Sequence, residues 1–130
     1  MIFKLDTNIF KYFQYDILSM GLYLYLDDKF ILLPYSFEDV LDGFDRDIYQ
    51  PYRLIENILK KKLGKILDVK PYASYIDPSK MEFLIEYMVR FENEKSSGKI
   101  GVKIIGSKNP ARTLIEYYKA EKRGRVKRYT

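Results

Sequence analysis

The sequence predicts an α/β domain in three layers (α/β/α), with helices on both faces of a mainly parallel central sheet. Its 130 residues suit one domain spanning 1–130, and a hydrophobic content of 47% is enough to bury a core. Short apolar runs alternate along the chain with segments of helical periodicity, as expected for a parallel sheet covered by helices. No run approaches the roughly 18 apolar residues of a transmembrane helix, so we expect no membrane association.

The first half of the chain contains two apolar runs that suit buried strands. They cover residues 2–5 and 30–34, and the second ends at a proline. Helical spacing predicts a helix over 8–20, and a serine suited to capping predicts another over 36–43. The alternating segment 22–26 fits either a strand or the continuation of a helix.

The second half is expected to hold three helices and two short strands. Proline near the first position and a following apolar stripe predict helices over 51–63, 78–91 and 110–123. The clearest spacing belongs to the middle one, where Met81, Leu84, Ile85 and Met88 repeat at i, i+3, i+4 and i+7. Short strands are expected over 66–69 and 126–130, and 98–107 is interpreted as a loop or a short ribbon.

The composition excludes several classes of chemistry. The chain has no cysteine and no histidine, so it offers no thiol nucleophile, disulfide, imidazole base or zinc site built on those ligands. Hydrolysis would have to rely on carboxylates, lysine, tyrosine or serine. The absence of cysteine favours a cytoplasmic location, and the scarcity of asparagine and glutamine suits a thermophilic source.

Charge is divided unevenly along the chain. Residues 1–50 carry nine acids and four bases, whereas residues 51–130 carry nineteen bases and nine acids. Acids gathered in one region suit a cation, and bases gathered in another suit phosphates. A solvated basic face without any ligand is the competing interpretation.

Two motifs resemble those of PIN-domain ribonucleases. The segment Leu5-Asp6-Thr7-Asn8-Ile9-Phe10 is similar to the family's opening motif, in which an apolar strand runs into Asp-Thr-Asn and then a helix. Residues 33–43 are similar to its second motif, whose helix bears an acid four residues before a glycine. That spacing selects Asp39, with Glu38 beside it. In the third motif, 106–116, the place of the family's acid falls on Arg112, and Glu116 lies one helical turn further on.

The resemblance implies the three-layer fold and a metal-dependent endoribonuclease. Asp6 and Asp39 would hold Mg²⁺ or Mn²⁺, and Glu116 would join them in catalysis. Thr7, Asn8 and Glu38 would orient the ligating carboxylates. Bases of the C-terminal segment would contact the RNA backbone: Arg112, Arg123, Arg125 and Arg128.

Other functions stay open at this point. An incomplete acidic site would weaken catalysis, leaving a toxin-like nuclease of low activity. The alternative is a catalytically inactive PIN-like protein, or an unrelated small α/β module that binds nucleic acid or a protein partner, for example from an archaeal virus or plasmid. An antitoxin is a conceivable partner, and a homodimer is not excluded.

Overall fold

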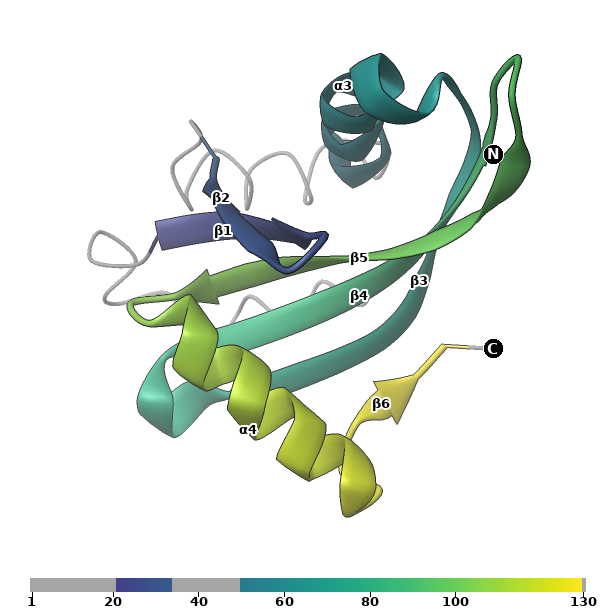
Figure 1. Ribbon diagram of the computed structural model, residues 1–130. Helices are drawn as coiled ribbons and strands as arrows, with labels where there is room; N and C mark the ends of the chain where they lie inside the picture. The colour runs from purple at the N-terminus through teal and green to yellow at the C-terminus, as the bar shows by residue number, and fades with distance from the viewer. Residues whose placement is uncertain (1–20, 34–49, 130) are drawn as a thin grey trace.

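The computed structural model describes residues 21–33 and 50–129, which form one sheet and two helices (Figure 1). The predicted strand over 2–5 and the predicted helices over 8–20 and 36–43 lie outside the described residues. The elements in chain order are β1 (Gly21–Leu26), β2 (Lys29–Leu32), α3 (Gln50–Leu63), β3 (Lys65–Asp77), the 3₁₀ turn η2 (Pro78–Lys80), β4 (Glu82–Glu92), β5 (Ser97–Ser107), α4 (Pro110–Lys122) and β6 (Lys127–Arg128).

The predicted fold class is wrong, because the sheet is antiparallel. Its six strands lie in the order β2-β1-β5-β4-β3-β6, and every pairing between them is antiparallel. Tight turns join β1 to β2, β3 to β4 and β4 to β5, so no crossover helix stands between these strands. At the first turn Asp27 and Asp28 both have positive φ, 52° and 61°, the conformation of a two-residue hairpin. The chain is therefore not a three-layer domain with a mainly parallel sheet.

The helix predicted over 78–91 is also wrong, since this segment is the central strand β4. Successive side chains of β4 point to opposite faces of the sheet, and both faces are covered. Phe83, Ile85 and Tyr87 enter one core, while Leu84 enters the other. A strand buried on both faces is apolar almost throughout, so it also contains matches to a helical repeat.

The two described helices confirm the predictions over 51–63 and 110–123. Helix α4 begins after Asn109, whose side chain accepts a hydrogen bond from the backbone N–H of Arg112 at 3.2 Å, and Pro110 follows the cap. Helix α3 ends with three lysines, and Gly64 then adopts a left-handed φ of 90°. Neither described helix is long and apolar enough to cross a membrane.

The helices pack on opposite faces of the sheet (Figure 1). Leu59 of α3 joins the larger core with Ile85 and Ile104, whereas Leu114 of α4 packs with Leu84 and Ile105. Neighbouring residues of one strand thus serve different cores. We call the side that carries α4 the α4 face.

The remaining strands differ from expectation in length and burial. Segment 22–26 is a strand, and 98–107 is a full strand of the sheet and not a loop. The run 30–34 is expected to be a buried strand, but Phe30, Ile31 and Leu32 are exposed at the edge of the described sheet, and of the described residues of the run only Leu33 is buried. The strand expected over 66–69 continues to Asp77. Only Lys127 and Arg128 form the last strand, β6.

Because two tyrosines are buried, we expect the protein to lose stability at alkaline pH. Burial raises the pKa of Tyr87 and of Tyr117, and the hydrogen bond from Tyr117 to Glu86 raises that of Tyr117 further. The folded pKa lies above the unfolded value of about 10, so stability is complete below about pH 10 and falls as the pH rises. Each tyrosine should cost about 1.4 kcal/mol per pH unit in that range. Urea unfolding of the parent and of Tyr117→Phe measures this, and equal alkaline slopes for the two proteins would contradict it.

Candidate nucleic-acid interface

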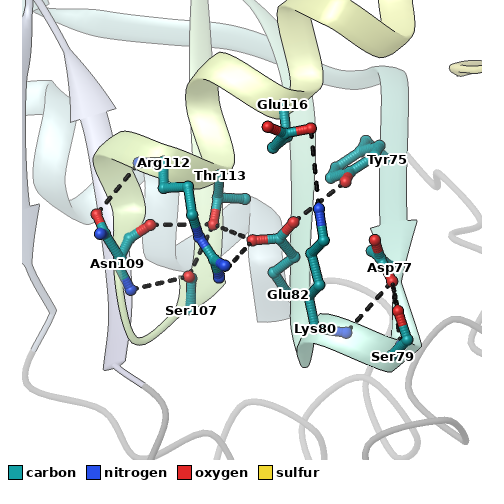
Figure 2. Close-up of polar contacts among 10 residues, drawn as sticks. All are labelled: Tyr75, Asp77, Ser79, Lys80, Glu82, Ser107, Asn109, Arg112, Thr113 and Glu116. Carbon is teal, nitrogen blue, oxygen red and sulfur yellow. Dashed lines mark hydrogen bonds and ion pairs between the residues drawn. The ribbon is translucent and has the colours of Figure 1, made fainter.

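A buried carboxylate joins the start of β4 to the start of α4 (Figure 2). Glu82 is fully buried, and its Oε2 accepts hydrogen bonds from Thr113 Oγ1 at 2.8 Å and from Arg112 Nη2 at 3.1 Å. Its Oε1 accepts one from the Tyr75 hydroxyl at 3.1 Å. Burial and the neighbouring Glu82 carboxylate raise the pKa of Tyr75, which therefore stays a donor. A carboxylate without these partners would be costly to bury.

The loop before α4 completes this cluster. The hydroxyls of Ser107 and Thr113 lie 2.7 Å apart, and Ser107 Oγ accepts a hydrogen bond from the Asn109 backbone N–H. Met81, directly before Glu82, has a left-handed φ of 53°, which is uncommon for a residue with a side chain. The turn at the start of β4 and the cap of α4 are thus both tied to Glu82, which fixes where α4 crosses the sheet.

A pocket of about 450 Å³ lies beside α4, between the helix and the end of β3. Its charged lining consists of four bases and two acids, which leaves two positive charges: Lys80, Lys119, Arg123, Arg125, Asp77 and Glu116. Arg123 and Arg125 make no ion pair with any residue in the described part of the chain. Two guanidinium groups therefore remain available to an anion in the pocket.

The two acids of the pocket are already engaged. Asp77 Oδ1 accepts hydrogen bonds from the Ser79 hydroxyl at 2.5 Å and from the backbone N–H of Lys80 at 3.3 Å. The Ser79 side chain contributes most to lowering the pKa of Asp77, which is ionised at neutral pH. Glu116 lies between two lysines, 3.6 Å from Lys119 Nζ and 4.0 Å from Lys80 Nζ.

A second basic pocket, of about 320 Å³, lies toward the start of β3. It is lined by Asp68, Lys70, Tyr72, Met88, Val89, Arg90 and Lys99. The register pairs Lys70 with Met88 and Tyr75 with Leu84, and residues 84 and 88 of β4 share one face. Both pockets therefore lie on the α4 face. Arg90 pairs with Asp68 at 3.2 Å, whereas Lys70 and Lys99 have no ion pair among residues 21–33 and 50–129.

Near the end of α4, a network of hydrogen bonds includes Arg128 but neither Arg123 nor Arg125. The Tyr117 hydroxyl donates to Glu86 Oε2 at 2.6 Å, and Arg128 Nη2 donates to Glu121 Oε2 at 2.9 Å. The Arg128 guanidinium also lies 4.9 Å from the centre of the Tyr72 ring. Arg128 is therefore held by neighbouring side chains, unlike Arg123 and Arg125.

The structure brings only some of the predicted site residues together. Asp6, Thr7, Asn8, Glu38 and Asp39 lie outside the described residues, so the expected metal pair stays a prediction. Within the described part of the chain, no group of three or more acids is arranged to hold a metal. Glu116, Arg123 and Arg125 share the first pocket, while Arg112 is bound to Glu82.

Sequence reasoning missed several residues of this face. Glu82, Lys80, Lys70 and Tyr72 were not singled out, because they come together only through strand pairing between segments far apart in the sequence. One signal for Glu82 was present: an acid set in an otherwise apolar run must find partners when the run is buried.

Arg112 and Arg123 are predicted to differ in their effect on stability. Arg112→Ala would remove one of the three donors to the buried Glu82, and we expect the free energy of unfolding to fall by about 2 kcal/mol, as for the loss of a hydrogen bond to a charged group. Arg123→Ala removes an exposed, unpaired arginine and should change it by less than about 0.5 kcal/mol. Urea unfolding compares the two variants, and equal losses would show that the Glu82 cluster does not hold α4.

Comparisons with known proteins give no information on the function of this chain. No protein-family model, no curated protein and no solved structure matches the chain. The PIN resemblance therefore has no support beyond its motifs, and the sheet is antiparallel where the resemblance implied a parallel one.

Proposed function

We propose that this protein binds single-stranded RNA along its α4 face. The observation that carries the proposal is the pocket beside α4, where Arg123 and Arg125 have no carboxylate partner among the described residues and Lys80 and Lys119 lie near them. Guanidinium groups form paired hydrogen bonds with phosphate oxygens, and phosphate contacts dominate the affinity of proteins for nucleic acid.

The spacing of the two pockets favours a polymer over a small phosphorylated ligand. Both are lined by β3, one near Lys70 and the other near Tyr75. Five residues of an extended strand span about 17 Å, which exceeds the size of a single phosphate group. A chain of phosphates can reach both pockets, and the excess of bases in residues 51–130 suits such a ligand.

An exposed ring beside the second pocket favours a single strand. Tyr72 is 43% exposed, and Lys70 and Lys99 line the same pocket. Unpaired bases stack on aromatic side chains, which paired bases within a duplex cannot do. The contact between Arg128 and Tyr72 restrains the ring in this position.

Charge removal in the first pocket is predicted to change the salt dependence of binding. In Arg123→Ala/Arg125→Ala the slope of log affinity against log salt should fall by about 1.4, since each phosphate contact on a single strand contributes about 0.7. Fluorescence anisotropy with a labelled RNA oligonucleotide over a salt series measures the slope.

The matched control for that experiment is Lys60→Ala/Lys61→Ala. It removes the same charge from exposed positions of α3, on the opposite face, and should leave the slope unchanged. If the slope fell equally in the two double variants, the fall would be explained by the lower net charge of the protein and not by phosphate contacts in the first pocket. An RNA affinity that does not depend on salt would overturn the proposal.

Tyr72 is predicted to contribute to single-strand binding through its ring. Tyr72→Ala should weaken binding of single-stranded RNA about tenfold or more, because stacking on one base is worth about 1–3 kcal/mol. Tyr72→Phe keeps the ring and should bind like the parent. A competition assay with single-stranded and duplex RNA of one sequence reports the effect, and an equal loss for both ligands would count against stacking.

The metal-dependent ribonuclease stays a prediction that rests on the motif around Asp6. Binding of RNA is compatible with it and does not require it. We place the RNA-binding activity in the cytoplasm, because a chain without cysteine suits a reducing compartment.

A further inference from the structure

Strand β2 is an exposed, apolar edge of the sheet. It lies at the end of the order of the described strands, and Phe30, Ile31 and Leu32 are 37%, 43% and 64% exposed. Pairing with β1 places Phe30 beside Tyr25 and Leu32 beside Tyr23, on the α4 face. Ile31 lies beside Leu24 and thus on the opposite face.

The register shows which backbone groups of β2 are directed outward. Leu33 donates its N–H to the Leu22 carbonyl, so the residue pair Leu22–Leu33 is hydrogen-bonded within the hairpin. Hydrogen-bonded and non-bonded pairs alternate in an antiparallel ladder, so Ile31 also faces β1. The N–H and C=O groups of Phe30 and Leu32 therefore point away from the sheet.

The opposite edge of the sheet is protected against pairing. Strand β3 has register shifts at 66–68 and at 71–73, contains Pro71, and is covered by β6 at Ala73 and Ser74. Bulges, proline and partial cover are the usual means of blocking an edge strand. Among the described residues, β2 has no bulge, proline or covering strand, and its only protection is its short length and Lys29.

We propose that β2 pairs with β2 of a second copy of this chain, antiparallel and centred on Ile31. Residues that face each other across a ladder have their side chains on the same side of the sheet. In two identical antiparallel strands the paired residues therefore differ by an even number of positions, so the two-fold axis passes through a residue position and not between two neighbouring residues. At Ile31 this axis sets Phe30 opposite Leu32 of the second copy. Both residues have outward backbone groups, so four interchain hydrogen bonds form.

A second copy suits this edge better than an unrelated strand would. The register matches each exposed apolar side chain with another apolar one and gives Phe30–Leu32 contacts on the α4 face. Lys29 is the only charged residue in the strand. The Lys29 residues of the two copies lie four positions apart along the ladder, or about 14 Å, so they repel each other little. Because the other edge is protected, pairing closes at two copies instead of propagating into a fibre.

The proposed dimer is a weak one with a defined shape. A single short strand pair lies at the low end of interface sizes, so we expect dissociation constants in the micromolar range. The two-fold axis stands perpendicular to the sheet and leaves both α4 faces on the same side. The inference itself needs no RNA, so it stands or falls independently of the proposed function.

Sedimentation velocity of the full chain over a range of concentrations tests the association. The parent should shift from monomer to dimer, and Leu32→Lys should weaken the dimer about tenfold or more, since it sets a charge against Phe30 of the second copy in both symmetry-related pairs. Ile115→Lys changes a similarly exposed apolar residue of α4 and should dimerise like the parent. A parent that stays monomeric, or a dimer that Leu32→Lys leaves intact, overturns the proposal.

Cysteine substitution tests the register, because the chain has no cysteine of its own. In Ile31→Cys the cysteines of the two copies face each other across the axis. They form a non-hydrogen-bonded pair, in which the two Cβ atoms are close enough for a disulfide to bridge them. With oxidised glutathione as the electron acceptor, two thiols should give one interchain disulfide in high yield. Phe30→Cys and Leu32→Cys do not face themselves and should give little. The reverse order of yields overturns the Ile31-centred register, whatever the stability of each variant.

Discussion

The position of α4 depends on one buried carboxylate. Glu82 accepts hydrogen bonds from Tyr75 of β3 and from Arg112 and Thr113 of α4, so it connects the sheet to the first turn of the helix. Breaking a buried ion pair is costly, and few alternative placements of the helix would satisfy the same three donors. With the start of α4 fixed in this way, its later turns set Lys119 and Arg123 opposite the end of β3, where the basic pocket forms.

Ion pairing then determines which cations are available to a ligand. Arg112 and Arg128 resemble Arg123 and Arg125 in the sequence, but the first pair has carboxylate partners and the second has none among the described residues. An arginine that already binds a carboxylate must give up that contact to bind phosphate, whereas an unpaired one gives up only water. If RNA binds as proposed, the α4 face would owe its affinity for phosphate to a small subset of its basic residues.

The sequence predicted the helices α3 and α4 correctly and the sheet poorly. Asn109 and Pro110 mark the start of α4 through local chemistry, so no tertiary information was needed. For 78–91 local signals conflicted: the helical repeat of Met81, Leu84 and Met88 coexists with an alternation of branched and aromatic residues, and burial on both faces hid the latter. The direction of strand pairing, and with it the pocket between β3 and α4, depends on contacts between distant segments that no local pattern contains. Of the candidate site, Arg123 and Arg125 were identified from charge alone, whereas Glu82 required the fold.

Chemical-shift mapping can show whether RNA binds the α4 face. In a titration of isotope-labelled protein with single-stranded RNA, we expect the largest shifts at the two pockets, at Lys70, Tyr72, Lys80, Arg123 and Arg125, with small shifts throughout α3 on the opposite face. Shifts concentrated on α3, or no shifts at any RNA concentration, would contradict the account.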